Sequence, residues 1–228
     1  MKRLLSYFSK LELTLWGLSV FLIITSFLVF DGKNFPTLVA SLIGVTSLIF
    51  NAKGNPFGQA LMILFSIIYG MISFGAAYYG EMITYMGMTL PMSVFAFVSW
   101  IRHPYKGQRT EVSVREVKRR DVVIMAVASV AVTVTFYYIL KYFDTADIVV
   151  STASVTTSFV AVYLTFLRSP LFALAYAMND MVLILLWAAA SAVNTLYIPV
   201  VVCFAAFLVN DIYGFVSWQR MKRRQSGK

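Results

Sequence analysis

Residues 171–190, LFALAYAMNDMVLILLWAAA, form an apolar run in which Asn179 and Asp180 stand side by side. A helix of about 20 apolar residues crosses the roughly 30 Å hydrocarbon layer of a bilayer. A carboxylate inside such a helix costs at least about 2.5–3.5 kcal/mol to insert, so it normally faces a wet or functional interior. The run therefore predicts a membrane-spanning helix that carries a polar site.

The composition of the whole chain is that of a multi-pass membrane protein. Its 228 residues are 60% hydrophobic and 13% charged, with a mean hydropathy of +0.78. A soluble domain is usually about 45–50% apolar and about 25% charged. We therefore expect an all-α integral membrane fold with eight transmembrane helices. The predicted spans are 12–30, 35–51, 57–79, 82–101, 122–141, 146–167, 171–190 and 196–218.

Basic residues fix the orientation of this topology. Of the 19 Lys and Arg residues, only Lys33 and Lys141 fall on the second side of the membrane. Cytoplasmic loops carry the Lys and Arg excess, so we predict a bacterial inner-membrane protein with both termini in the cytoplasm. Residues 35–51 are short for a span, but the asymmetry is lost if they do not cross. Topology accounts for the net charge of +9 better than nucleic-acid binding does.

Residues 102–121 are the largest polar segment between spans. We interpret them as a solvated cytoplasmic connection, with a phosphate- or lipid-binding surface as the alternative.

Two parts of the chain look like copies of each other. In each, a helix with an amide side chain (Gln59 or Asn179) is followed by a helix that contains a proline and ends at Trp100 or Trp218. Four spans separate equivalent helices, so the copies run in parallel, and parallel repeats characterise one class of transporter. The resulting division is 1–34 (extra N-terminal helix), 35–104 (first three-helix bundle), 105–145 (loop and linker helix), 146–220 (second bundle) and 221–228 (basic tail).

The seventh span concentrates the candidate site residues. Phe172, Tyr176, Asn179, Asp180 and Trp187 follow helical spacing and share one face. Trp187 is equally well explained as part of the aromatic belt at the membrane interface. For Asp180 a functional position is the better interpretation.

The eighth and third spans add further candidates. Asn210 and Tyr213 share a face of the eighth span, whereas Asp211 is turned about 100° away from Asn210. We therefore expect Asp211 to serve packing. Gln59 and Tyr69 are the candidates in the third span.

Aromatic rings, one acid and several amides suit a flat cation or a neutral aromatic ligand. Stacking a cation on such rings contributes about 0.5–2 kcal/mol per contact. The predicted spans contain no Arg or Lys in their interiors to bind a phosphate. The only histidine, His103, and the only cysteine, Cys203, form no metal or nucleophile pattern, so we expect neither an enzyme nor a cofactor.

The chain resembles the PnuC-type nicotinamide riboside transporters, which are relatives of the SWEET sugar transporters. The resemblance covers nearly all of the chain after the first span. It rests on the order and spacing of 55–59 (NPFGQ), Tyr69-Gly70, 100–102 (WIR), 168–172 (RSPLF), Asn179-Asp180 and 210–214 (NDIYG) through Trp218. In the family's seventh-helix pattern, two Trp residues three apart precede an Asn; here Phe172 and Ala175 stand in the Trp positions.

The resemblance implies three helices, a linker helix and three helices, and facilitated diffusion of nicotinamide riboside that cytoplasmic phosphorylation makes irreversible. Thiamine and riboflavin are alternative cargoes of related transporters, and a non-transporting membrane subunit is the alternative from another class. The partners expected are the small-molecule substrate, the lipid bilayer, a vitamin kinase and, as one option, two further copies in a homotrimer. The expected substrate-binding residues are Phe172, Tyr176, Asn179, Asp180, Trp187, Gln59, Asn210 and Tyr213.

Overall fold

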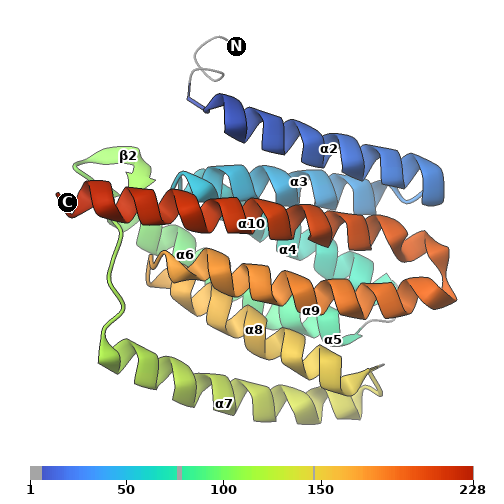
Figure 1. Ribbon diagram of the computed structural model, residues 1–228. Coiled ribbons are helices and arrows are strands. Elements are labelled where there is room, and N and C mark those ends of the chain that lie inside the picture. Colours follow the sequence, from blue (N-terminus) through green and yellow to red (C-terminus); the bar gives the residue numbers. More distant parts are fainter. Residues whose placement is uncertain (1–6, 76–78, 146, 228) are drawn as a thin grey trace.

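The computed structural model describes residues 7–75, 79–145 and 147–227 (Figure 1). In that part of the chain, eight helical segments are long and apolar enough to cross a membrane, which matches the predicted number. The elements are α2 (Lys10–Phe30), α3 (Phe35–Ala52), α4 (Phe57–Gly75), α5 (Tyr79–Thr84), η1 (Tyr85–Thr89), α6 (Leu90–Arg102), β1 (Pro104–Tyr105), β2 (Gln108–Val112), α7 (Arg119–Tyr142), α8 (Ile148–Phe166), α9 (Leu171–Val193), η2 (Thr195–Tyr197) and α10 (Ile198–Gln225).

The helix limits lie close to the sequence prediction. Residues 76–78 and 146, at the predicted edges of the third and sixth spans, lie outside the described residues. The 18 residues of α3 extend about 27 Å at 1.5 Å per residue, close to the thickness of the hydrocarbon layer. The short second span is therefore long enough to cross.

The fourth span, α5 to α6, is continuous but contains one turn of π-helix. This turn, η1, ends immediately before Leu90 and Pro91, at the start of α6. Proline lacks an N–H and crowds the preceding turn, and a wider π turn accommodates this locally. Tyr85, the first residue of this turn, is buried, as are Met88 and Thr89 at its end.

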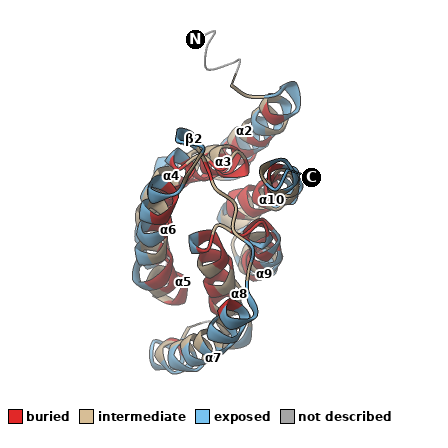
Figure 2. Cartoon of the chain, turned by 90° about the vertical axis from the view of Figure 1, so that its left-hand side faces the viewer, coloured by how far each residue is buried: buried red, intermediate tan, exposed pale blue. Residues whose placement is uncertain are grey.

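The helices form two groups that face each other. Helices α3, α4 and α6 pack together, as do α8, α9 and α10, and the groups meet mainly where α3 contacts α10 and α6 contacts α8. Figure 2 shows that the buried residues lie on the facing sides of the two groups. Helix α7 packs at the edge, against α8 and α5, and α2 packs outside α3 and α10. These contacts are compatible with the predicted triplets and linker, and that division stays an interpretation.

A pair of Ser-Trp dipeptides joins the two groups at one end. We call this the basic end, because Lys53, Arg102, Arg168 and Arg220 follow or end the helices there. Trp100 Nε1 donates to Thr165 O at 2.9 Å, and the hydroxyl of Ser99 donates to Phe166 O at 3.1 Å.

The second dipeptide repeats this geometry in the reverse direction. Trp218 Nε1 donates to Asn51 O, and the hydroxyl of Ser217 donates to Ala52 O, both at 2.7 Å. In both cases the acceptors are the last two residues of a helix, whose carbonyl groups lack partners within the helix. The final helix of each group therefore caps the first helix of the other, and we refer to these four contacts as the crossed Ser-Trp bonds.

The polar segment 102–121 is more ordered than a solvated connection. It forms a small antiparallel β1–β2 hairpin, and Val112 at its end is fully buried. The N–H of Val112 donates to Gly54 O, and the N–H of Arg115 donates to Arg168 O, so the segment contacts both groups. Burial, followed by the nearby charge of Arg115, lowers the pKa of Arg168. Residues 106–110 and 118–120 are exposed, as expected of a solvated connection, whereas Val112 packs against the helix ends.

We expect Trp100→Phe and Trp218→Phe each to lower the free energy of unfolding by about 1 kcal/mol, because the buried carbonyls of Thr165 and Asn51 lose their side-chain donor and keep only a backbone N–H of the following turn. Trp16→Phe is the matched control, since Trp16 Nε1 bonds the Thr46 hydroxyl at an exposed position. Unfolding of the purified protein in mixed micelles measures all three. Losses no larger than that of Trp16→Phe would show that the crossed bonds do not stabilise the fold.

Candidate functional site

A small cavity lies between the two helix groups, near the middle of the spans. Its volume is about 20 Å³, enough for about one water molecule. Three of its lining residues, Tyr176, Asn179 and Asp180, are predicted site residues of α9. Together with them it is lined by Leu48, Met62, Phe65, Tyr85, Thr89, Ser158, Phe204, Phe207 and Asp211.

Asn179 is held in place by α8. Its Oδ1 accepts hydrogen bonds from the hydroxyls of Thr157 at 2.8 Å and Ser158 at 2.9 Å. Both donors lie on the face of α8 that packs against α9. The amide is therefore oriented before any ligand arrives, which reduces the entropy lost on binding.

Asp180 and Asp211 form a pair of carboxyl groups across the interface of α9 and α10. Both are buried, and their side chains lie within hydrogen-bonding reach of each other. Oδ2 of Asp180 has no hydrogen-bond partner among the described residues. None of the cavity-lining residues is Lys, Arg or His, so no cation of the protein faces this pair.

Aromatic rings from three elements close the other side of the cavity. Phe65 of α4 lies 5.9 Å from Tyr85 of η1 and 5.7 Å from Phe207 of α10, measured between ring centroids. Phe204 contributes a fourth ring, 5.6 Å from Phe207. Sequence reasoning missed all four, although Glu81 lies four residues before Tyr85 and Asp211 four residues after Phe207, a spacing that puts each acid on the face of its ring.

Two of the predicted aromatic residues lie beyond the ends of the cavity. Phe172 packs at the basic end, with its ring 4.8 Å from that of Trp218 and 6.2 Å from that of Trp100. Trp187 lies toward the opposite end, where its Nε1 donates to the Tyr69 hydroxyl at 2.8 Å. The predicted face of α9 points into the protein, but it extends beyond both ends of the cavity.

Three predicted polar residues bond to neighbouring helices instead of facing the cavity. Gln59 donates to Asn51 Oδ1 at 2.9 Å. The Nδ2 group of Asn210 donates to the Ser19 hydroxyl of α2 at 2.9 Å and to Ala206 O at 2.8 Å. The Tyr213 hydroxyl donates to Glu12 of α2 at 3.0 Å.

On α10 the structure therefore reverses the expected assignment. The sequence placed Asn210 and Tyr213 toward the ligand and Asp211 in packing. Asp211 lines the cavity, while Asn210 and Tyr213 face α2. The angular offset was predicted, but the position of α2, which decides which face is inward, was not.

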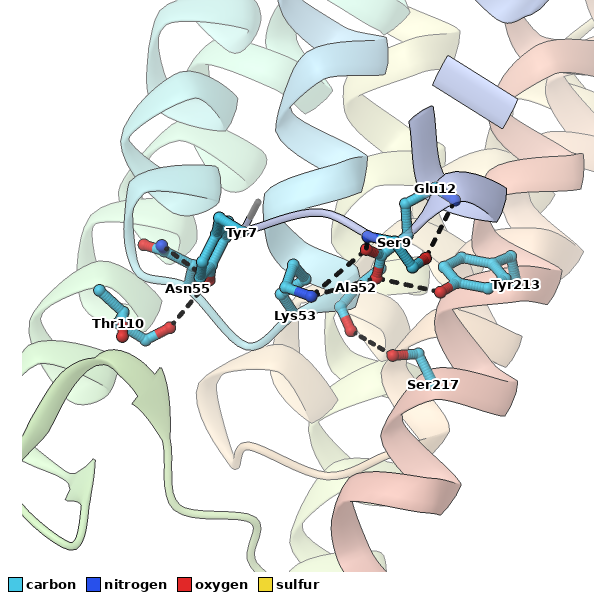
Figure 3. Close-up of polar contacts among 9 residues, drawn as sticks. All are labelled: Tyr7, Ser9, Glu12, Ala52, Lys53, Asn55, Thr110, Tyr213 and Ser217. Carbon is cyan, nitrogen blue, oxygen red and sulfur yellow. Dashed lines mark hydrogen bonds and ion pairs between the residues drawn. The ribbon is translucent and has the colours of Figure 1, made fainter. Parts of the chain in front are cut away.

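Glu12 is the centre of a polar cluster that attaches α2 to both groups (Figure 3). Its carboxylate lies 3.3 Å from Lys53 Nζ, at the end of α3, and accepts from Tyr213 of α10. It also accepts from the N–H of Ser9, whose hydroxyl accepts from the N–H of Glu12 in a capping box. Burial raises the pKa of the nearby Tyr7, against the lowering effect of its hydrogen bond with Asn55.

A larger cavity, which we call the vestibule, opens at the end opposite the basic end. Its volume is about 570 Å³, and residues of α3, α4, α9, η2 and α10 line it. Between the vestibule and the central cavity the space narrows to a cavity of only about 10 Å³, which we call the constriction. Its lining includes Tyr69, Trp187, Ser41 and Cys203. A cavity of about 260 Å³ at the basic end shares no lining residue with the central cavity, whereas the constriction shares Phe65 and Phe204 with it. Access to the central cavity is therefore more direct from the vestibule.

Comparisons with known proteins all point to transporters, and each covers most of the chain. The family model "Nicotinamide mononucleotide transporter" matches residues 34–220. The chain belongs to this family of transporters. The family model begins at the end of the α2–α3 loop, so α2 is an element that it does not include.

Two members of this family can be named. The chain is 24% identical over 204 residues to the nicotinamide riboside transporter PnuC of Neisseria mucosa, covering 88% of this chain and 78% of the relative. The crystal structure of the vitamin B3 transporter PnuC has the same fold, with a TM-score of 0.82 and 22% identity over 96% of this chain and 94% of that one. Membership of a transporter family agrees with the expectation that the chain is not an enzyme.

We expect Glu12→Ala to lower the free energy of unfolding by about 3 kcal/mol, because Lys53 and Tyr213 lose a buried charged partner. Glu116→Ala is the control, since the Glu116–Lys222 ion pair is exposed and such pairs contribute at most about 1 kcal/mol. Denaturant-induced unfolding in micelles compares them. Equal losses would show that the Glu12 cluster does not anchor α2.

Proposed function

We propose that this chain carries nicotinamide riboside across the bacterial inner membrane by facilitated diffusion. The observation that carries the proposal is the central cavity, in which two carboxyl groups meet Tyr176, Tyr85 and other rings. A pyridinium ring is a flat cation, so carboxylates balance its charge and aromatic rings stack on it. The name of the N. mucosa relative, a nicotinamide riboside transporter, supports the same cargo.

The charge of the site argues against a phosphorylated cargo. The family model is described by the mononucleotide, whose phosphate needs cationic or N–H donors. The central cavity is lined by carboxyl groups, with no Lys, Arg or His among its lining residues. Repulsion between these carboxylates and a phosphate favours the unphosphorylated riboside.

Transport by alternating access is the second part of the proposal. A cavity of about 20 Å³ is far below the roughly 300–1,000 Å³ of ordinary ligand sites, so the two helix groups must separate to admit a nucleoside. The vestibule offers the entry, with Tyr69 and Trp187 as the inner barrier. Release at the basic end then requires the crossed Ser-Trp bonds to break.

The remaining parts of the proposal are the orientation in the membrane, trapping by a kinase and the oligomeric state. We place the basic end and both termini in the cytoplasm, following the distribution of Lys and Arg. A cytoplasmic vitamin kinase then traps the riboside by adding a charged phosphate. The homotrimer implied by the family resemblance stays a prediction, and the mass of the detergent-solubilised complex tests it.

Thiamine is the competing cargo, because it is also an aromatic cation and the carboxyl pair favours cations in general. Riboflavin is neutral and leaves the carboxyl pair without a counter-charge. Competition between nicotinamide riboside and thiamine for the purified protein separates the two vitamins. If thiamine binds and nicotinamide riboside does not compete with it, the cargo is thiamine, and the proposed binding site is unchanged.

We expect Asp180→Asn to weaken binding of nicotinamide riboside by about tenfold, which corresponds to about 1.4 kcal/mol of lost charge interaction. Glu116→Gln, at an exposed carboxylate outside the cavity, is the control. Titration calorimetry measures both, and uptake into vesicles that enclose the kinase tests transport. Unchanged affinity in Asp180→Asn would remove this carboxylate from the site, and absence of uptake by the wild type would contradict the transport function.

A further inference from the structure

The vestibule has the volume of a ligand site, whereas the central cavity does not. Ordinary ligand sites enclose roughly 300–1,000 Å³, and the vestibule measures about 570 Å³ against about 20 Å³ for the central cavity. The constriction of about 10 Å³ lies between the two. A nucleoside that arrives at this end therefore meets a space that fits it before it meets the residues of the central cavity.

One carboxylate gives the vestibule its charge. Asp31, which caps the C-terminal end of α2, is the only charged residue among the described residues that line the vestibule. Its Oδ1 accepts from the N–H of Asn34 at 3.1 Å, which fixes the carboxylate at the start of the α2–α3 loop. Lys33 in the same loop is exposed and is not one of these lining residues. The vestibule therefore presents a negative charge to an incoming ligand.

An aromatic ring lines the vestibule beside an element that contacts α2. Tyr197 of η2 is half-buried, and η2 packs against α2 at this end. The ring of Tyr197 lies 5.3 Å from that of Trp187, measured between centroids, and Trp187 lines both the vestibule and the constriction. A ligand that packs on Tyr197 therefore lies one ring away from the barrier to the central cavity.

Most of the remaining lining is apolar, and two amide side chains add hydrogen-bonding groups: Ile68, Ile72, Leu196, Val200, Asn34 and Asn194. Oδ1 of Asn34 and Oδ1 of Asn194 each accept from a backbone N–H, so both amides are held in fixed orientations. An apolar lining with a few fixed polar groups is the usual composition of a small-molecule site.

We propose that the vestibule is an outer binding site for flat organic cations, which are held there by Asp31 and Tyr197 before they pass the constriction. This inference rests on the proposed function and adds a second site to it. A carboxylate at the entrance raises the local concentration of a cation and its rate of association. The family model begins at residue 34, so the charge of this site comes from outside the matched residues. No coupled ion takes part, and the step is compatible with facilitated diffusion.

Uptake kinetics separate a binding role of Asp31 from a structural one. We expect Asp31→Asn to raise the external concentration of nicotinamide riboside for half-maximal uptake about threefold, because an exposed charge contact contributes a factor of about five at most. The maximal rate should not change, since Asp31 acts before the constriction and Asn keeps an acceptor for the N–H of Asn34. Initial rates of uptake into vesicles that enclose the kinase measure both quantities.

Asp144→Asn is the matched control for this experiment. Asp144 is an exposed acid at the same end of the protein, does not line the vestibule, and has a left-handed backbone conformation that Asn adopts readily. It therefore reports the general effect of surface charge. A lower maximal rate in Asp31→Asn, or the same change in both variants, would overturn the proposal.

The aromatic part of the site has its own pair of variants. We expect Tyr197→Leu to raise the half-saturating concentration about threefold and Tyr197→Phe to leave it unchanged, because stacking needs the ring and not the hydroxyl. The same uptake assay measures them. An equal change in both variants would contradict stacking on Tyr197.

Direct binding distinguishes a failure of the outer site from a failure of the proposed function. In the full-length Asp180→Asn variant, saturation-transfer NMR with nicotinamide riboside should detect weak binding that Asp31→Asn reduces about threefold. The binding should also weaken between about 0.01 M and about 0.1 M salt, as expected of a solvent-accessible charge. The uncharged dihydronicotinamide riboside should respond to neither change. Uptake by the wild type without any binding that depends on Asp31 would overturn the outer site and leave the proposed function intact. Binding that depends on Asp31 in a protein that takes up no riboside would support the outer site and contradict the proposed function.

Discussion

The crossed Ser-Trp bonds are the constraint on which the arrangement of the two helix groups depends. A helix that ends inside a membrane protein leaves carbonyl groups that no water can satisfy. Here the last carbonyls of α3 and α8 accept from Ser217-Trp218 and Ser99-Trp100, respectively, so each group completes the other. Because the donors are crossed, separation of the groups at the basic end removes a side-chain donor from all four carbonyls, of which those of Thr165 and Asn51 keep a backbone N–H of the following turn. These four bonds therefore hold the two helix groups together at the basic end.

The two buried carboxyl groups of the central cavity have no basic residue beside them among the described residues. Asp180 and Asp211 lie behind the constriction at Trp187, and no basic residue lines their cavity. A structural pair would be expected to have a cationic partner, as Glu12 has in Lys53. Glu12 is paired, whereas one oxygen of Asp180 and one of Glu81 have no hydrogen-bond partner among the described residues. Asp180 differs from Glu81 in that it lines the central cavity, so its carboxyl group is the one placed to meet a ligand.

Sequence reasoning predicted the elements better than the contacts between them. Hydropathy and charge located the eight spans, and helical spacing placed Tyr176, Asn179 and Asp180 on one inward face, as observed. The same spacing showed that Asn210 and Asp211 point apart, but only the position of α2 decides which of them is inward. Tyr85 was missed for a related reason, because its inward position depends on how α5 and η1 pack against the other helices, which the sequence does not show. Local periodicity fixes a face, and tertiary packing decides what that face meets.

Helix α2, which lies outside the residues that the family model matches, provides hydrogen-bond partners for polar residues of α10. The family model starts at residue 34, yet α2 supplies Ser19 and Glu12 to bind Asn210 and Tyr213. Without α2, this face of α10 would present an amide and a phenol to lipid, which is costly for unpaired polar groups. With α2 in place, Nδ2 of Asn210 and the hydroxyl of Tyr213 donate to acceptors outside the cavity. Asp211 is then the polar residue that this turn of α10 presents to the cavity, so the acidic character of the site depends on a helix that does not line it.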